Sequence, residues 1–356
     1  MKKLYTTPEY KAYQKRRLLN IEKKLRKERL AELRAKRKGK PKAKKKHKHQ
    51  AHDIKLPVNA PSDLRLIENT DKCLEFFRDL RSEEFRSKRG EIEFVILSLK
   101  EVTQIDYGTI SILTAIGDDL KFKGVILRSF LPDHPQCKEY MIESGYLNNL
   151  YDDNGKPFPK APKSELMFFE KGCGRLSDDE SRKISLLIKK IVGHLTGVEK
   201  YCQPLRTIIL EICGNSIEWS GTDNKQWLLG VKYRDDRVIF TVTDVGRGIL
   251  ESLYRKFTKR FFEVFKSNAE ILKGAFDKKY GSTTKEKNRN KGLPAVKANF
   301  HQGTINNLKV LTNNVILHFD DDKLSKEFEN GTPRFKGTFY QWEMTNDCLT
   351  KLISAK

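Results

Sequence analysis

Three pieces of sequence decide the fold of this chain: LRTIILEICGNSIEW at residues 205–219, VIFTVTDVGRGI at residues 238–249 and NKGLP at residues 290–294. The first has isoleucines at helical spacing. The second is a β-branched and aromatic run, typical of a buried strand, that ends at an Asp and two glycines. The third precedes a further helical run. In this order, the three pieces together predict a nucleotide site.

Two side chains of the first piece predict metal and water chemistry. Glu211 and Asn215 are four residues apart, so a helix presents them on one face. Proteins hold Mg²⁺ through one or two oxygen side chains together with phosphate oxygens, and an amide and a carboxylate suit that ion. The carboxylate can also orient or deprotonate an attacking water. The pair therefore predicts a Mg²⁺ ligand beside a general base.

The end of the predicted strand has the features of a base-binding pocket. Asp244 can accept a hydrogen bond from an exocyclic amine such as that of adenine. Gly246 and Gly248 let the backbone turn tightly and approach a flat ligand that a side chain would exclude. We therefore expect the base of a nucleotide to lie against this turn.

A polar stretch further along the chain is suited to phosphate. Ser282 and Thr283 supply hydroxyl groups, and Gly292 precedes the helical run from Leu293 to Phe300. Backbone amides at the start of a helix attract anions. These residues are therefore predicted to lie near the phosphates of the nucleotide.

This set of motifs resembles the GHKL superfamily of Bergerat-fold ATPases, which includes histidine kinases and anti-sigma-factor kinases. The first piece resembles the N box of that family, DVGRG in the second piece resembles its first glycine box, and the third piece resembles its second glycine box. The likeness covers roughly residues 177–344. It departs from the family at Asn290, where a glycine is usual.

The resemblance implies an α+β two-layer sandwich of Bergerat type that binds ATP with Mg²⁺. It implies that Asn215 coordinates Mg²⁺, that Glu211 is the general base and that Asp244 binds the adenine amine. It also implies that Thr338, in the closing strand, lies near the adenine and that residues 249–291 form an enlarged ATP lid. The residues expected to contact the nucleotide or its metal are Asn215, Asp244, Gly246, Gly248, Ser282, Thr283, Gly292, Leu293 and Thr338.

The predicted lid segment is rich in aromatic residues, among them Phe257, Phe261 and Phe265. Their spacing predicts at least one amphipathic helix. Its apolar face can be interpreted in two ways. It belongs to the local core, or it is a surface that the nucleotide state exposes for contact with a protein partner or a second copy of the chain.

Residues 54–151 alternate between helix and strand patterns, which predicts an α/β domain. Helices are predicted at 71–85, 109–120 and 137–144, and strands at 93–99 and 125–127. The segments LSL at 97–99, VTQID at 102–106 and ISIL at 110–113 carry a resemblance of residues 91–150 to the STAS domain of anti-sigma-factor antagonists and sulfate transporters. In this resemblance the phosphoacceptor serine of the family falls on Gly108, so Thr109 and Ser111 are neighbouring candidates only. The alternative is an ordinary α/β domain in which Asp106 caps the helix that follows.

The N-terminal tail carries most of the net charge of +23: residues 1–50 hold 21 Lys or Arg against 4 Glu. Residues 10–38 favour a helix, and residues 40–49 form a basic run that we expect to be disordered. Such a run attracts phosphates by counterion release. It therefore binds nucleic acid or an acidic partner, or it serves as a solvated tail.

Six cysteines without CxxC spacing predict reduced thiols and a cytoplasmic protein. We expect no signal peptide, and no run of about 18 apolar residues predicts a membrane span. The predicted organisation is a basic tail at 1–53, the STAS-like domain at 54–151, a linker at 152–164 and the ATP-binding domain at 165–350.

The predicted function is that of an ATP-binding regulatory protein of bacterial type. Mg-ATP would switch the lid and the contact with a protein partner, with slow hydrolysis. Two alternatives remain open. One is a serine/threonine protein kinase of the anti-sigma-factor type that uses the same site. The other is a non-enzymatic, nucleic-acid-binding adaptor in which the nucleotide is structural.

Overall fold

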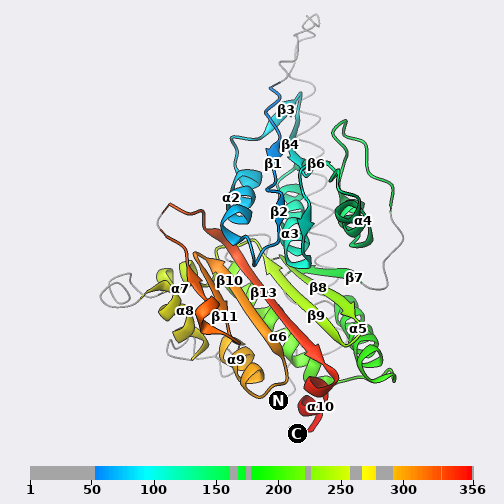
Figure 1. Ribbon diagram of the computed structural model, residues 1–356, viewed down its shortest axis with the longest axis vertical. Helices are drawn as coiled ribbons and strands as arrows, with labels where there is room; N and C mark the ends of the chain where they lie inside the picture. Colours follow the sequence, from blue (N-terminus) through cyan, green and yellow to red (C-terminus); the bar gives the residue numbers. More distant parts are fainter. Residues whose placement is uncertain are drawn as a thin grey trace, which may run out of the picture. The chain divides into compact units, whose positions relative to one another are not determined.

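The computed structural model describes residues 53–160, 167–173, 178–220, 226–256, 267–277, 292–329 and 331–354. The chain forms two compact units, Met1–Ala51 and His52–Lys356, and all of the described residues belong to the second. The helix predicted at 10–38 and the basic run at 40–49 therefore lie outside the described residues. The architecture of the second unit is mixed α/β, which confirms the predicted class at that level (Figure 1).

A seven-stranded sheet in the order β12-β11-β10-β13-β9-β8-β7 organises the C-terminal half, and every neighbouring pair is antiparallel. Its strands are β7 (Met167–Cys173), β8 (Gln226–Arg234), β9 (Arg237–Asp244), β10 (Asn306–Asn313), β11 (Val315–His318), β12 (Lys326–Glu327) and β13 (Phe335–Thr345). The β8–β9 hairpin turns at Asp235 and Asp236. Figure 1 shows β13 running between β10 and β9.

One face of this sheet is covered by helices of the C-terminal half. These helices are α5 (Asp178–Thr196), α6 (Gln203–Ser220), α7 (Ile249–Lys256), α8 (Asn268–Phe276), α9 (Gly292–His301) and α10 (Asn346–Ser354). Ile208 and Ile212 of α6 share a hydrophobic cluster with Phe240 of β9 and Trp342 of β13. The last two rings are stacked with centroids 5.0 Å apart. The sequence piece at residues 205–219 therefore forms a core helix against the central strands.

The N-terminal half is built on a smaller sheet. Its elements are β1 (Val58–Asn59), β2 (Asp63–Leu64), α2 (Thr70–Arg81), β3 (Ser87–Arg89), β4 (Ile92–Ser98), β5 (Gln104–Ile105), α3 (Tyr107–Phe122), β6 (Val125–Phe130), α4 (Pro135–Glu143) and a short 3-10 helix, η2 (Tyr146–Asn149). β1 and β6 pair with β4 in parallel, and β3 pairs with it antiparallel. The prediction of a helix to residue 85 is too long, because Ser82 has extended backbone and ends α2.

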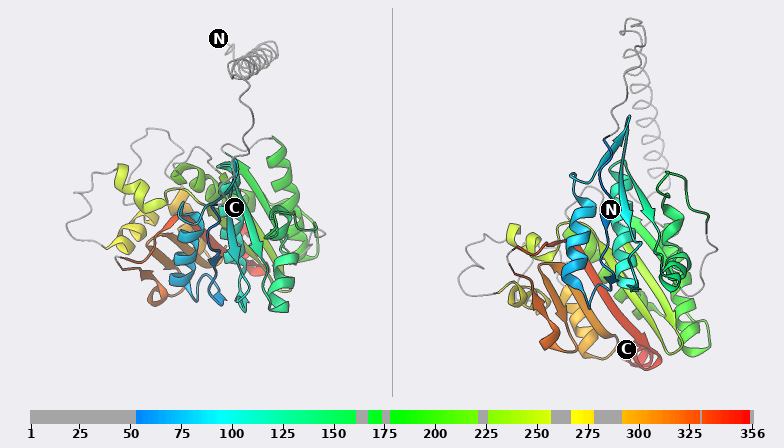
Figure 2. Two further views of the ribbon diagram at one scale, coloured as in Figure 1. Left: turned by 90° about the horizontal axis from the view of Figure 1, so that it is seen from above. Right: turned by 45° about the horizontal axis from the view of Figure 1, so that its top comes forward.

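Helix α3 joins the two halves by packing on the second face of the seven-stranded sheet (Figure 2). The Ser111 and Thr243 hydroxyls share a hydrogen bond of 2.7 Å, and the Tyr107 hydroxyl donates to Val231 O at 3.0 Å. A second hydrophobic cluster contains residues from both halves, among them Leu113 of α3 and Phe339 of β13. The seven-stranded sheet is thus a middle layer between α6 and α3.

The packing of the first turn of α3 explains why a glycine stands at position 108. A Cβ on Gly108 would lie 3.0 Å from Phe339 Cζ and 3.3 Å from Gln341 Oε1, so the missing side chain lets α3 approach β13. Asp106 caps the helix by accepting a hydrogen bond of 2.7 Å from Thr109 N, as the alternative interpretation predicts.

The two neighbouring phosphoacceptor candidates are not accessible in this arrangement. Thr109 and Ser111 are both 0% exposed. Thr109 Oγ1 donates to Leu64 O at 2.6 Å, and Ser111 is held against the sheet by the hydrogen bond described above. Their role as candidates is therefore contradicted by the packing of α3, which places both hydroxyls inside the protein.

Five cysteines, Cys73, Cys137, Cys202, Cys213 and Cys348, are buried free thiols, which confirms that prediction for these positions. Among the helices of the described segments, none has both the length and the apolar character needed to cross a bilayer.

Candidate functional site

The predicted base-binding residue Asp244 is the last residue of β9, and it lies directly opposite Thr338 of β13. Both side chains are 1% exposed. Because side chains alternate along a strand, Asp244 and Thr338 point to the same face as Val242 and Tyr340, which belong to the cluster under α6. The fold therefore brings together two residues that are 94 positions apart in the sequence.

One of the two oxygens of the Asp244 carboxyl takes part in the local turn. Its Oδ1 accepts a hydrogen bond of 2.9 Å from Gly246 N, which closes the glycine turn after the strand. Its Oδ2 is buried and has no hydrogen-bond partner among the described residues. Thr338 Oγ1 is also buried without a hydrogen-bond partner in the described part of the chain, and it lies close enough to the carboxyl to affect its pKa. Buried polar atoms without partners are costly and are concentrated at ligand sites.

The surroundings of Asp244 change its protonation. Burial raises the pKa of this carboxyl from 3.8 to about 7, although the Gly246 amide, Thr338 and the positive charge of Arg81 all favour the ionised form. The carboxyl is therefore balanced between its two protonation states near neutral pH. A buried acid with this property is typical of functional sites.

Tyr340 belongs to the same group of side chains, and the sequence reasoning missed it. Its hydroxyl is buried without a partner in the described part of the chain. Burial raises the pKa of Tyr340, and the negative charge of Asp244 raises it further, so the phenol keeps its proton. The alternation of side chains along a strand could have identified Tyr340, because Tyr340 lies two positions after Thr338 and therefore points to the same face.

The two glycines of the turn have different structural roles. Gly248 has φ +84°, and a Cβ there would lie 2.5 Å from Asn313 Oδ1. Asn313 Oδ1 in turn accepts hydrogen bonds from Leu250 N at 3.1 Å and Glu251 N at 3.3 Å. In the folded chain, Gly248 thus makes its close approach to a side chain of β10. The contact of Gly246 and Gly248 with a nucleotide stays a prediction. Gly246 contributes its N–H to Asp244.

The N-terminal half fixes the backbone on both sides of the Asp244–Thr338 pair through one arginine of α2. Arg81 Nη2 donates to Val245 O at 2.8 Å, and Arg81 Nη1 donates to Lys336 O at 2.7 Å. Val245 follows Asp244, and Lys336 lies two residues before Thr338. No local pattern could have revealed this contact, because Arg81 is 164 and 255 residues away from its two partners.

The remaining predicted site residues are placed only in part. Glu211 lies on α6 and is half-buried, while Asn215 lies on the same helix with its side chain outside the described set. Ser282 and Thr283 lie outside the described residues. Gly292 is the first residue of α9, and Leu293 is 5% exposed.

The described residues therefore supply no complete set of ligands for the predicted metal ion. In the described segments, no group of three or more His, Cys, Asp or Glu side chains could hold a metal ion. What the structure assembles is the strand-end group of Asp244, Thr338 and Tyr340. Comparison of the chain with models of protein families, with curated proteins and with solved structures finds no match to any of them.

Proposed function

We propose that residues 165–350 form an ATP-binding domain of GHKL, Bergerat-fold type and that residues 54–151 form a STAS-like domain attached to it. The observation that carries the proposal is the pair of buried oxygens, without partners among the described residues, on Asp244 at the end of β9 and on Thr338 near the start of β13. An adenine ring presents an amine donor, which Asp244 Oδ2 would accept. Its ring nitrogens are acceptors for a hydroxyl of Thr338 or Tyr340.

The arrangement around this pair supports the same assignment. The helix with the Glu211 and Asn215 spacing packs on the sheet face to which Asp244 points. The glycine turn leads directly into α7, and Gly292 begins α9. The order of helix, hairpin, glycine turn, lid region and closing strand is the order that the resemblance implies.

The phosphates of the nucleotide would be held by residues other than Asp244 and Thr338. Asn215 would be the protein ligand of Mg²⁺, and Ser282, Thr283 and the first amides of α9 would contact phosphate oxygens. The metal, when bound, would neutralise phosphate charge. Glu211 would orient the attacking water and take its proton.

We propose that ATP regulates contact with a protein partner and that hydrolysis is slow. Arg81 supports this coupling, because it connects α2 to the two backbone segments beside the base-binding pair. A change in the strand-end loop on nucleotide binding would therefore reach α2 directly. Protein binding through the STAS-like half or the lid, self-association and nucleic-acid binding through residues 1–50 remain predictions.

The chemistry is tested with the full chain and γ-labelled ATP in Mg²⁺. We expect slow release of labelled phosphate that Glu211→Ala abolishes, while ATP binding persists. Label transferred to a protein would identify a kinase instead. ATP binding with neither release nor transfer would contradict catalysis and leave a nucleotide-dependent adaptor. The matched control is Glu199→Ala, which removes an exposed carboxylate just before α6 and is expected to leave phosphate release unchanged.

A further inference from the structure

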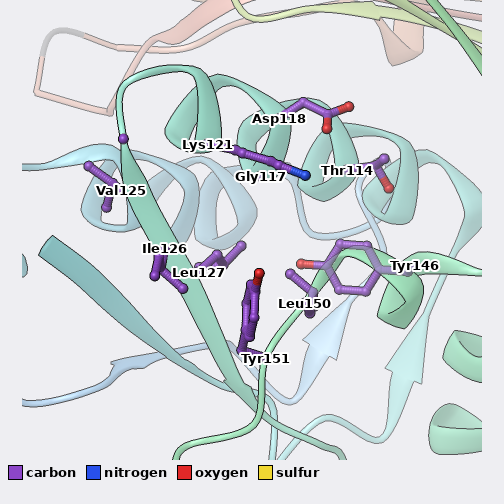
Figure 3. A pocket seen from close by; sticks show the side chains of 11 residues that line it. Thr114, Gly117, Asp118, Lys121, Val125, Ile126, Leu127, Tyr146, Leu150 and Tyr151 are labelled. Carbon is purple, nitrogen blue, oxygen red and sulfur yellow. The ribbon is translucent and has the colours of Figure 1, made fainter. Parts of the chain in front are cut away.

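A cavity of about 240 Å³ lies in the N-terminal half, and no part of the proposed ATP site lines it. Figure 3 shows it between α3, β6 and the segment around Tyr146 and Tyr151. Its apolar lining comes from Val125, Ile126, Leu127 and Leu150, and its polar lining comes from Thr114, Asp118, Lys121, Tyr146 and Tyr151. The cavity is large enough for a small organic molecule.

Tyr146 provides the observation that points to a ligand. The residue is 3% exposed, and its hydroxyl is buried with no hydrogen-bond partner in the described segments. Figure 3 shows this hydroxyl pointing into the cavity. Burial raises the pKa of Tyr146, so the phenol remains a hydrogen-bond donor at neutral pH. A ligand with an acceptor would satisfy it.

The charges around the cavity favour an anion. Asp118 is already paired with Lys171, at 2.9 Å between Oδ1 and Nζ. Lys121 lies one turn of α3 after Gly117 and two turns after Thr114 on the same lining, and it makes no ion pair with any described residue. The unbalanced charge beside the Tyr146 hydroxyl is therefore positive. The Tyr151 hydroxyl also faces this space (Figure 3).

We propose that this cavity binds a small amphipathic monocarboxylate. Its carboxylate would accept a hydrogen bond from the Tyr146 hydroxyl and pair with the Lys121 ammonium, and its apolar body would lie against Val125, Leu127 and Leu150. One cation, a few hydroxyl donors and an apolar wall suit a single negative charge on an apolar molecule. A phosphate dianion would require more donors than the lining supplies. This inference is independent of the proposed ATP site.

The test uses sodium octanoate as the probe, titrated into the full chain by calorimetry, with octanol as the uncharged comparison. We expect saturable octanoate binding and at least about tenfold weaker octanol binding, because a hydrogen bond to a charged group contributes roughly 1.5–3 kcal/mol. Tyr146→Phe should weaken octanoate binding by about tenfold or more without lowering the melting temperature, since it removes a buried hydroxyl that has no partner among the described residues.

A second variant and a matched control distinguish the loss of a positive charge at the cavity from a general effect on folding. Lys121→Gln changes an exposed side chain and should also weaken octanoate binding, whereas Lys138→Gln removes an exposed lysine of α4 that does not line the cavity and should have no effect. Octanoate binding that Tyr146→Phe leaves unchanged would overturn the proposal. So would a folded wild-type chain that shows no saturable binding at millimolar octanoate.

Discussion

At the scale of single residues, Asp244 is the most informative position in the chain. The sequence identified it as a strand-end acid, but only the fold shows that one of its oxygens is buried opposite Thr338 without a described partner. The same reasoning found Thr338 through family resemblance and missed Tyr340, which has no motif of its own. Position in a strand, and not residue type, is what makes Tyr340 part of the group.

The raised pKa of Asp244 predicts a specific pH dependence of stability. The carboxyl has a pKa of about 7 in the folded chain against 3.8 in a model compound, so the folded state binds its proton more tightly than the unfolded state. Its contribution to stability is therefore complete below about pH 4 and is lost as the pH rises through 7, by up to about 4 kcal/mol. Asp244→Asn should remove this loss. The free energy of unfolding of the variant should therefore rise relative to that of wild type as the pH increases from 5 to 8.

Chemical denaturation at pH 5, 6, 7 and 8 measures this difference. Asp235→Asn is the control, because Asp235 is an exposed residue in the turn of the same hairpin. It should follow the wild-type pH dependence. A constant difference between Asp244→Asn and wild type across this range would show that Asp244 titrates normally.

At the scale of elements, the long and strongly patterned segments were predictable and the short ones were not. Helix α3 was predicted at 109–120 and spans Tyr107–Phe122, and the strand predicted at 93–99 is β4 (Ile92–Ser98). Strands β1, β2 and β5 have two residues each, which is too few for any periodicity to appear. Pairing with distant segments defines them, as when β1 pairs with β4.

Helix α2 carries a prediction of its own through Arg81. Its guanidinium donates to two carbonyl oxygens in different segments, which a lysine ammonium cannot reach in the same planar geometry. Arg81→Lys should therefore destabilise the chain by roughly 1–3 kcal/mol, because at least one partly buried carbonyl loses its partner.

Arg78→Lys on the same helix is the comparison, since Arg78 is exposed and forms an ion pair with the adjacent Asp79. That variant should stay within about 0.5 kcal/mol of wild type. Equilibrium denaturation in urea compares the three chains. Equal stability of Arg81→Lys and wild type would mean that the two hydrogen bonds do not hold α2 to the sheet.

At the scale of the second unit, the seven-stranded sheet is covered on both faces, and the N-terminal half supplies the second layer. The sequence predicted two domains joined by a linker and gave no sign of this shared core. The reason is physical: the contact combines apolar side chains such as Leu113 and Phe339 with buried hydrogen bonds among Ser111, Thr241 and Thr243, so no continuous apolar pattern marks it. Gly108 was interpreted as a lost phosphoacceptor, and its close approach to Phe339 offers a packing reason for the same residue.

A shared core predicts that the two halves unfold together. Trp227 and Trp342 are buried in the seven-stranded sheet, so their fluorescence reports on the C-terminal half, whereas far-ultraviolet circular dichroism reports on both halves. The two signals should give coincident urea transitions. A dichroism transition that precedes the fluorescence transition would show that the N-terminal half is an independent domain.

The central claim is that Asp244 binds the base of ATP, and calorimetric titration of the full chain with Mg-ATP tests it most directly. Wild type and the control Asp235→Asn should bind ATP equally, and both should bind GTP more weakly, because guanine presents a carbonyl where adenine presents its amine. Asp244→Asn should lose roughly tenfold or more in ATP affinity, as expected for a hydrogen bond to a charged group. Absence of ATP binding by the folded wild-type chain, or equal affinity in Asp244→Asn, would contradict the account.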